Sequence, residues 1–453
     1  MNFLAISSEI ATTILAMVIL GIDLLMPKEK SRKCLGYITV IGLVGVFIAI
    51  FNQYHLGNAP TFVQNLFIMD NLALLIKQMC LLAVGFTVLF SVDFVEKLPK
   101  HHGEFYVLIL SALIGMMVMA SANDFLTLFV GLELMAISFY VLVGYALKSS
   151  NSSEAGVKYL IVGSTSSAIM LYGVSLVYGT TGSIIFQELA ANFALYSTAA
   201  LVGILMVLIG FFFKMSIIPF HMWAPDIYQG APTPITALLA TASKTAAVAA
   251  LIRVLFMAFA IVKIYWLPVL VLLSTLSMIG GNLMALRQTN VKRLLAYSSI
   301  AQAGYMLIGI IAADAAGIKG VLFYTLIYII ANIGAFSVLI AVDKNYGEAE
   351  FSTIAGLGQR APLLAAVLTI SLLSMAGIPP MAGFVGKLYL FTAVVEKGHL
   401  LLAFIGFIMS MISVYYYLQV AKTMYIDKPM KSEKIELTFA IRVTVLLSLI
   451  GTV

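Results

Sequence analysis

Long apolar runs joined by short polar connectors fill almost the whole chain. A bilayer-spanning helix needs about 20 mostly apolar residues, and these runs lack the polar–apolar alternation of a membrane β-barrel. In hydrocarbon, only helices and closed barrels satisfy their backbone hydrogen bonds. The pattern therefore predicts an all-α polytopic membrane protein of about 14 transmembrane helices, near residues 9–26, 35–52, 70–92, 105–121, 124–147, 157–179, 197–228, 233–260, 265–286, 294–312, 320–342, 361–395, 400–424 and 438–453.

The composition excludes most soluble classes of protein. Of the 453 residues, 62% are apolar and 10% are charged, whereas soluble domains have about 45–50% and about 25%. Cys34 and Cys80 are too few for a disulfide framework, a four-thiolate iron–sulfur cluster or a cysteine zinc site. No glycine-rich nucleotide-binding pattern or haem-type histidine pair stands out. We therefore expect a chain that moves a small species and holds no cofactor or metal itself.

The positions of lysine and arginine orient the predicted helices, because cytoplasmic connectors are enriched in both. Eighteen of the 26 fall in alternate connectors, beginning with the dense cluster at 28–33. The opposite connectors hold only four, Arg253, Lys263, Lys319 and Lys397. This asymmetry predicts a multi-pass protein of a bacterial-type inner membrane with both termini outside; an organellar or thylakoid membrane is the alternative.

Two predicted spans are interrupted by proline, which removes a helical hydrogen bond and clashes with the preceding turn. The breaks lie at 214–225 in the seventh span and at 375–384 in the twelfth. Each is the fourth helix of a five-helix block, and an odd number of helices inverts the second block, as in inverted-repeat transporters. We expect an N-terminal three-helix segment (1–104), two inverted repeats (105–260 and 261–424) and a C-terminal connector with helix 14 (425–453).

Glu133 and Lys214 are the first candidate site residues. A charge at the bilayer centre is costly, so such groups face partners or water and commonly mark proton paths. Glu133 lies near the middle of the fifth predicted helix, and Lys214 lies five residues before the proline of the seventh. Burial favours a neutral amine, whereas a nearby carboxylate favours an ammonium. A Glu133–Lys214 pair could thus hold or release a proton, although a purely structural ion pair is the alternative.

Lys244 and Lys387 are two further lysines inside predicted spans. Lys244 lies about eleven residues into the eighth helix, roughly 15 Å deep at 1.5 Å per residue. That is too deep for it to reach the interface, so we expect it to be buried near water rather than snorkelling. Lys387 follows the second break among glycines, which permit close approach of water or a helix. It is the counterpart of Lys214 in the second repeat.

His221 and Lys77 complete the membrane-embedded candidates. His221 is seven residues after Lys214, so a continuous helix would put both on one face, where an imidazole suits a proton relay. A hydrogen-bonded interface histidine is the alternative. Lys77 lies near the expected outer boundary beside Asp70, where snorkelling explains it without function.

Several stretches together resemble a known family. They are 210–237 with its continuation to 247, then 131–145, 293–305 and 376–387. These stretches are similar to the subunit N family of the proton-translocating NADH:quinone oxidoreductase, respiratory complex I (type I NADH dehydrogenase). The similarity spans nearly the whole chain. Shorter pieces are also shared with subunits L and M and with Mrp-type cation/proton antiporters.

The resemblance implies an antiporter-like fold of fourteen helices and a proton relay through Glu133, Lys214, Lys244 and Lys387. His221 is a further candidate for the relay on the positional argument above. It implies that quinone reduction in other subunits disturbs the Glu133–Lys214 pair electrostatically and so drives a proton toward Lys244 and Lys387. The chain would be part of a translocase enzyme without a redox centre of its own. NADH, FMN, iron–sulfur clusters and quinone would belong to partner subunits, and subunit M and the small subunits J and K would be its neighbours.

Two other functions share these features. One is an Mrp-type sodium/proton antiporter subunit, and the other is a membrane subunit of an energy-converting hydrogenase. The motif around the seventh and eighth helices and the modest chain length favour the redox-driven pump. Co-isolation with quinone-reducing subunits would separate it from an antiporter that exchanges sodium electroneutrally.

Overall fold

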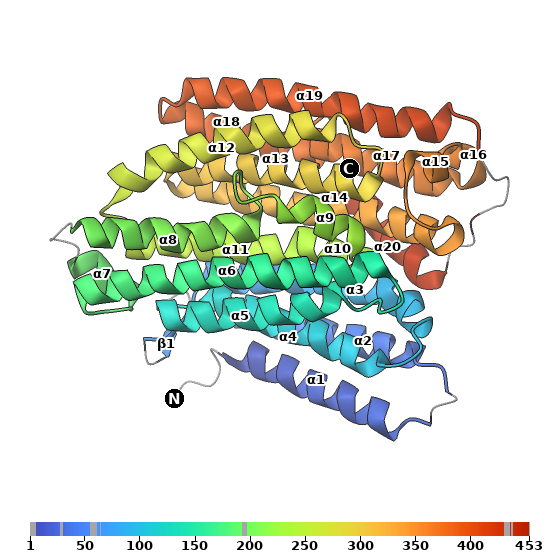
Figure 1. Cartoon of the computed structure of the whole chain (residues 1–453), viewed down its shortest axis with the longest axis horizontal. Coiled ribbons are helices and arrows are strands. Elements are labelled where there is room, and N and C mark those ends of the chain that lie inside the picture. Colours follow the sequence, from blue (N-terminus) through green and yellow to red (C-terminus); the bar gives the residue numbers. More distant parts are fainter. Residues whose placement is uncertain are drawn as a thin grey trace. The chain divides into compact units, whose positions relative to one another are not determined.

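The computed structural model describes residues 6–27, 30–54, 61–63, 65–192, 197–429, 435 and 438–452 (Figure 1). Long helices dominate it, as the apolar runs predict. The elements are α1 (Ser7–Leu25), α2 (Lys33–Gln53), β1 (Thr61–Val63), β2 (Phe67–Met69), α3 (Asn71–Glu96), α4 (His102–Ser121), α5 (Phe125–Val143), α6 (Ser150–Thr181), α7 (Phe186–Asn192), α8 (Thr198–Met215), α9 (Trp223–Gly230), α10 (Thr233–Leu238), the π-helical turn η2 (Leu239–Ser243), α11 (Lys244–Arg253), the π-helical turn η3 (Val254–Ala258), α12 (Lys263–Ala285), α13 (Val291–Ala312), α14 (Ala315–Tyr346), α15 (Phe351–Ile354), α16 (Leu357–Arg360), α17 (Pro362–Ala376), α18 (Ala382–Glu396), α19 (Leu400–Tyr425) and α20 (Phe439–Thr452).

The chain divides into two compact units. The first comprises Met1–Met215 and Gly230–Trp266, and the second comprises Ser216–Gln229 and Leu267–Val453. The first unit therefore contains α1 to α8 and the span from α10 to η3. The second contains most of α9 and α12 and all later helices.

The membrane-spanning character is confirmed, but fourteen spans are not. In the described ranges, twelve helices are long and apolar enough to cross a bilayer, or thirteen if the bent pair Phe351–Arg360 and Pro362–Ala376 is one span. The predicted span at 361–395 is split between α17 and α18, each of 15 residues. The last helix, α20, has 14 residues, about 21 Å at 1.5 Å per residue, which is shorter than a hydrocarbon core of about 30 Å.

Both predicted helix breaks are present. α8 ends at Met215, and Ser216 adopts a left-handed conformation with φ 59°, followed by a cis Ile218–Pro219 bond. In the second unit, α17 ends before Gly377, whose φ is 83°, and a cis Pro379–Pro380 bond precedes α18. Each break leaves helix-terminal carbonyls without a partner in the following turn.

In the first unit, glycines let neighbouring helices approach closely. A Cβ on Gly173 of α6 would lie 2.6 Å from the carbonyl oxygen of Gly203 of α8, and one on Gly203 would lie 2.9 Å from that of Gly173. Small residues are common at such membrane helix interfaces because packing there depends on close backbone approach. α6 and α8 consequently pack along their length, side by side in Figure 1.

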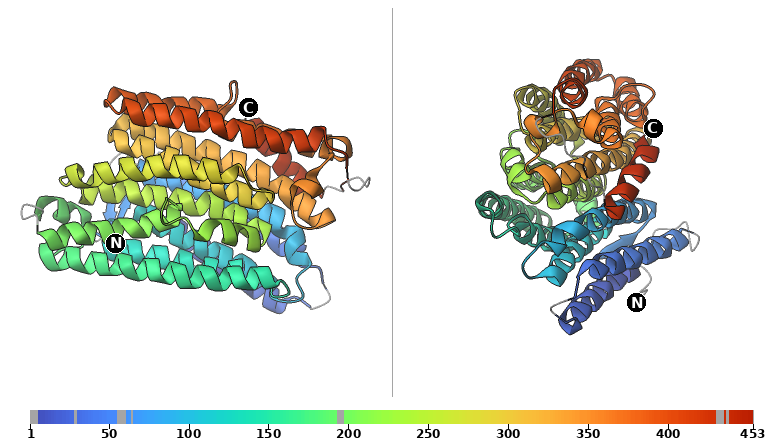
Figure 2. Two further views of the ribbon diagram at one scale, coloured as in Figure 1. Left: turned by 45° about the horizontal axis from the view of Figure 1, so that its top comes forward. Right: turned by 90° about the vertical axis from the view of Figure 1, so that its right-hand side faces the viewer.

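In the second unit, α14 is the central helix. It packs against α13, α17, α18 and α20. In its 18-residue apolar stretch, 89% of the residues are buried. α19, the red helix at the top of the left view in Figure 2, packs along α17. Only 33% of its 18-residue apolar stretch is buried. The polar residues of α13 and the lysine of α18 are therefore set around a buried helix, while α19 exposes most of its apolar surface.

The expectation that Lys77 snorkels to the membrane surface is wrong. Its side chain is 1% exposed, and its Nζ forms a 2.7 Å ion pair with Oε1 of Glu9 in the first turn of α1. Arg253, assigned from the sequence to an outer connector, is likewise buried in α11. It pairs with Asp70 at 2.6 Å and donates to the Ala120 carbonyl. A paired charge has no need to reach the surface, because its partner compensates for the loss of water.

Breaking the Glu9–Lys77 pair is expected to loosen α1. Lys77→Met leaves a buried carboxylate unpaired, which costs about 3–5 kcal/mol, whereas replacing both partners with uncharged residues is often close to neutral. Hydrogen exchange of the α1 amides should therefore speed up in Lys77→Met and return toward the wild-type rate in Glu9→Gln/Lys77→Met. Equal exchange in the single variant and the wild type would contradict this role.

Asp314 caps α14 outside the membrane-spanning helices. Its Oδ1 accepts the Gly317 N–H at 2.8 Å, and its Oδ2 pairs with Lys397 at 2.9 Å. The Gly317 N–H and then the Lys397 ammonium hold the pKa of Asp314 below its usual value. A lowered folded-state pKa gives stability that is present above the unfolded pKa and is lost as pH falls through the folded one.

The first turn of α14 should accordingly become less protected in acid. Protection of its amides should be constant at neutral pH and should fall below about pH 4, near the usual pKa of aspartate. Asp314→Asn retains a good capping residue but cannot titrate. Hydrogen exchange measured against pH should therefore show the acid loss in the wild type only, and an identical profile in both proteins would exclude this source.

Candidate functional site

Lys214 ends α8 inside a cage of aromatic rings. Its side chain is 2% exposed. Its Nζ lies 5.7 Å from the ring centre of Tyr140, 5.9 Å from that of Tyr159 and 5.6 Å from that of Phe213. Within the described residues, Nζ has no hydrogen-bond partner. Ring faces attract a cation, by about 2 kcal/mol or more when it is desolvated. The cage therefore shelters an ammonium without fixing it by a hydrogen bond.

The first unit builds this cage from three helices. Tyr140 comes from α5, Tyr159 from α6 and Phe213 from α8, and the rings of Tyr140 and Tyr159 meet edge to face at 5.0 Å. Gly163, one turn beyond Tyr159 on α6, leaves the space that the Tyr140 ring occupies, since a Cβ there would overlap the tyrosine hydroxyl. The cage wall thus depends on a glycine as well as on the rings.

Glu133 lies two helical turns before Tyr140 on α5. Its Oε1 is buried and, like the Lys214 Nζ, lacks a hydrogen-bond partner in the part of the chain that the structure describes. Glu133 is nevertheless within electrostatic range of Lys214. The two expected partners are therefore neighbours without direct contact, and the Tyr140 ring lies against the lysine.

The helix break does not supply the surroundings of the Lys214 ammonium. A break leaves helix-terminal carbonyls that could bind a cation, but the Lys214 Nζ lies among aromatic rings instead. The reason is the direction of the side chain. In a helix, side chains tilt toward the N-terminus, so a lysine in the last turn of α8 points away from the break that follows.

Lys244 is buried as expected, with 1% of the residue exposed. It belongs to the candidate span Thr233–Ala258, whose 18-residue apolar stretch is wholly buried. It begins α11 directly after the π-helical turn η2, and such turns are frequent at functional sites. The flanking hydroxyls of Thr241 and Thr245 donate to carbonyls of their own helix, at 2.7 and 3.0 Å. Each hydroxyl oxygen can still accept a hydrogen bond. α11 packs on α8, so the first unit contains Glu133, Lys214 and Lys244 together.

Lys387 belongs to the second unit, where it folds back on the end of α17. Its Nζ donates to the Ala376 carbonyl at 2.9 Å and to the Ser410 hydroxyl at 2.8 Å. It also lies 4.4 Å from the ring centre of Tyr305. The C-terminal end of a helix carries partial negative charge. The helix end, the hydroxyl and the ring together compensate for the charge of Lys387.

A polar chain continues from this lysine along α13. Gln302 donates to the Met375 carbonyl, next to the carbonyl that Lys387 binds, at 3.0 Å, and it accepts from Tyr324. Ser298 shares a hydrogen bond with the Tyr417 hydroxyl. Ser298 and Gln302 are one turn apart on α13. Their hydrogen bonds place them beside the Lys387 site.

The expectation that His221 shares a helix face with Lys214 is wrong. α8 ends at Met215, so no continuous helix links the two residues. Ser216 in a left-handed conformation and Pro219 break the register between them. His221 is 8% exposed in the second unit, and its Nδ1 lies 3.4 Å from the Pro219 carbonyl oxygen. This contact fits the hydrogen-bonded alternative given above.

Sequence reasoning found the charged residues and missed what surrounds them. Nothing in the local sequence marks Tyr140, Tyr159 or Ser410 as neighbours of a lysine, because each comes from a different helix. Among the described residues, no group of three or more His, Cys, Asp or Glu side chains could hold a metal ion.

A family model described as NADH:quinone oxidoreductase/Mrp antiporter, transmembrane, matches residues 122–413. The matched region is more than half of the chain and includes Glu133, Lys214, Lys244 and Lys387. The chain belongs to this family. The four charged residues thus lie in the part of the chain that defines the NADH:quinone oxidoreductase/Mrp antiporter family.

Individual family members agree over nearly the full length. The chain is 48% identical over 454 residues to NADH-quinone oxidoreductase subunit N of Heliobacterium modesticaldum, covering 100% of this chain and 96% of that one. It also superimposes on a chain of respiratory complex I from Thermus thermophilus with bound aureothin. That superposition has a TM-score of 0.83 and 29% identity, and covers 98% and 95% of the two chains. A chain of the Mrp complex from Dietzia sp. DQ12-45-1b, at 24% identity, has the same fold with a TM-score of 0.84 and covers 95% of this chain and 82% of that one.

Proposed function

We propose that the chain is an antiporter-like membrane-arm subunit of a proton-pumping NADH:quinone oxidoreductase, with Glu133, Lys214, Lys244 and Lys387 as its proton relay. The observation that carries the proposal is the Lys214 ammonium, buried among three rings with no hydrogen-bond partner in the described residues. A structural lysine is normally paired when buried. A buried lysine that has no hydrogen-bond partner and lies within electrostatic range of a carboxylate is suited to taking up and releasing a proton.

The separation of Glu133 from Lys214 gives the pair two states. In the arrangement seen, the two groups are within electrostatic range, and Glu133 Oε1 and Lys214 Nζ form no hydrogen bond among the described residues. At 4 Å their attraction would reach about 4 kcal/mol for an effective dielectric near 20. Closing the pair would therefore retain a proton on Lys214, and opening it would release one. An electrostatic disturbance from quinone reduction in other subunits would supply the change.

Lys244 is the proposed acceptor within the first unit, because α11 packs on α8 and both lysines are buried. Lys387 is the proposed site of exchange with the aqueous phase through the second unit. Its ammonium is held by a helix end, a hydroxyl and a ring. Broken helices in transporters place such helix ends at ion sites. His221 is left out of the proposed relay, because its contact with the Pro219 carbonyl fits a hydrogen-bonded histidine.

The wider assembly is part of the same proposal. The order α4, α5, α6, broken α8, α10–η3 is repeated by α12, α13, α14, broken α17–α18, α19. This order supports two inverted five-helix repeats at 105–260 and 261–424, between an N-terminal segment (1–104) and a C-terminal one (425–453). Subunits M, J and K would be neighbours, and NADH, FMN, iron–sulfur clusters and quinone would be bound by other subunits. The complex would lie in a bacterial inner membrane, with both termini of this chain outside.

The proposal is tested on the purified complex in proteoliposomes. NADH oxidation by quinone should drive proton uptake, and Glu133→Ala should lower the number of protons moved per electron without loss of assembly. Glu188→Ala, an acidic residue on the surface helix α7, is the matched control. Wild-type pumping in Glu133→Ala would contradict the assigned role of this carboxylate.

A second function within the family is cation/proton exchange, because the matching family model also covers Mrp antiporters. The two functions differ in the driving force. Isolation of the chain without quinone-reducing subunits, together with sodium uptake against a proton gradient in the absence of NADH, would favour the antiporter. Dependence of transport on NADH oxidation would favour the pump.

A further inference from the structure

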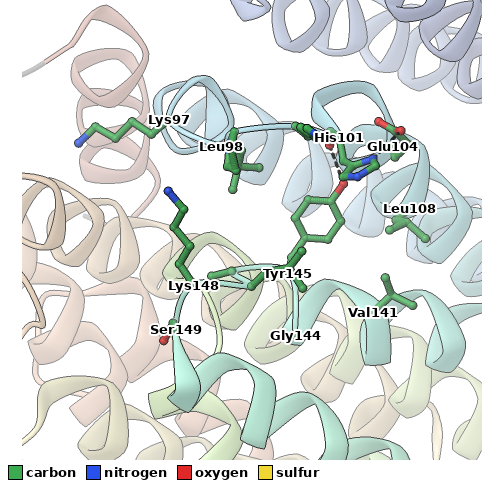
Figure 3. A pocket seen from close by; sticks show the side chains of 14 residues that line it. Lys97, Leu98, His101, Glu104, Leu108, Val141, Gly144, Tyr145, Lys148 and Ser149 are labelled. Atoms are coloured by element: carbon green, nitrogen blue, oxygen red, sulfur yellow. Dashed lines mark hydrogen bonds and ion pairs between the residues drawn. The ribbon is translucent and has the colours of Figure 1, made fainter.

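The first unit contains a pocket that the relay does not use. It has a volume of about 740 Å³ and opens between the α3–α4 connection and the α5–α6 connection. Figure 3 shows Lys97 and Leu98 on one side of it, and Tyr145 and Lys148 on the other. The Tyr145 hydroxyl donates to the His101 carbonyl at 2.6 Å, which joins the two connections across the pocket.

The mouth of this pocket is positively charged. Lys97, Lys100 and Lys148 line it, and all three are exposed. The one carboxylate among the lining residues, Glu104, pairs with the imidazole of His101 at 2.9 Å, and the three lysines outnumber it. An anionic group is therefore the complementary occupant.

The walls of the pocket are apolar and lie where helices end. Leu98, Leu108, Val141 and Leu147 line it, and Val141 and Leu147 are 49% and 79% exposed. α4 and α5, which carry Leu108 and Val141, are candidate membrane spans. A soluble anion would gain nothing from contact with these apolar side chains, whereas a lipid has both a charged headgroup and an apolar acyl chain. Basic pockets at the cytoplasmic ends of membrane helices are typical sites for anionic headgroups.

We propose that this pocket binds an anionic phospholipid. The phosphate lies among Lys97, Lys100 and Lys148, and the acyl chain runs over Leu108, Val141 and Leu147 toward the bilayer. The lipid fills the space between two connections that flank α4 and α5. It thereby becomes a structural part of the first unit at the membrane surface.

The test uses the purified complex, delipidated in detergent and then titrated with phosphatidylglycerol or phosphatidylcholine. Lipid retained by this chain is counted by native mass spectrometry. The chain should retain phosphatidylglycerol in preference to phosphatidylcholine. Lys97→Gln/Lys148→Gln should weaken phosphatidylglycerol binding by roughly 30-fold, from the usual gain per basic residue near an anionic surface. Lys422→Gln/Lys428→Gln, which removes two exposed lysines outside the pocket, should leave retention unchanged.

Two further arms identify the occupant. Leu108→Trp fills the pocket without changing its charge, so it should also lower retention, and excess inorganic phosphate should not displace the lipid. Equal retention of both lipids, no effect of the Lys97/Lys148 variant, or displacement by phosphate would overturn the proposal. A photocrosslinker at Leu147 that captures a protein chain in the assembled complex, rather than lipid, would also overturn it.

Discussion

Replacing Lys214 with methionine should reduce redox-driven proton pumping by roughly tenfold or more, because a positioned proton-transfer group contributes factors of about 10²–10⁴ to its step. Methionine has no proton to give, yet it fills the same volume and makes favourable contacts with aromatic rings. The cage of Tyr140, Tyr159 and Phe213 should therefore stay packed. The measurement is the number of protons moved per NADH oxidised in proteoliposomes, with assembly checked by native gel.

The control for this prediction is Lys422→Met, which removes an exposed lysine of α19. It should pump at the wild-type level. Lys214→Arg provides a second comparison, since it keeps a charge that is effectively permanent. It should lose pumping like the methionine variant. If Lys214→Met pumps normally, or if Lys214→Arg does so, a titrating group at this position is excluded.

Loss of Lys387 should also reduce redox-driven proton pumping by roughly tenfold or more, because it too would remove a positioned proton-transfer group. Lys387→Met removes the ammonium that binds the Ala376 carbonyl and the Ser410 hydroxyl. Ser410→Ala removes only one of these contacts, and its hydroxyl also donates to the Ala376 carbonyl. It should therefore lower pumping by only about twofold, the factor for the lower end of the usual net contribution of about 0.5–1.5 kcal/mol per hydrogen bond.

The order of these two effects separates a proton-carrying lysine from a structural one. If Lys387 only holds α18 against the end of α17 through its hydrogen bonds, Ser410→Ala and Lys387→Met should both destabilise the second unit. Neither variant should then change the number of protons moved per electron in the assembled enzyme. Hydrogen exchange of the α17 and α18 amides, measured beside pumping, distinguishes the two cases. An unchanged ratio in Lys387→Met would remove this lysine from the relay.

The spans and their breaks could be predicted from the sequence because the bilayer constrains both strongly. A hydrocarbon core demands long apolar helices, and proline interrupts them at 219 and at 379–380. The count of fourteen is not confirmed, because short segments such as α20, with 14 residues, were judged only by their apolar residues. The hairpin of β1 and β2 and the short helices α7, α15 and α16 have no apolar periodicity long enough to predict them.

The buried lysines could also be predicted, whereas their partners could not. A charge in an apolar run is visible in the sequence, but the group that neutralises it comes from a distant segment. Glu9 was overlooked as the partner of Lys77, because 68 residues separate them. The rings around Lys214 and the helix end below Lys387 likewise depend on packing between helices. The His221 expectation failed for a local reason, since it assumed helical register through the break.

The most direct test of the relay is the position of ordered water around the buried lysines of the first unit, determined by high-resolution electron cryomicroscopy of the intact complex. Stable internal water needs about two to four polar partners. The relay predicts water within hydrogen-bond distance of the Lys214 Nζ and of the Glu133 carboxylate, continuing to Lys244. Dry packing around all three side chains, with no space that water can enter, would contradict it.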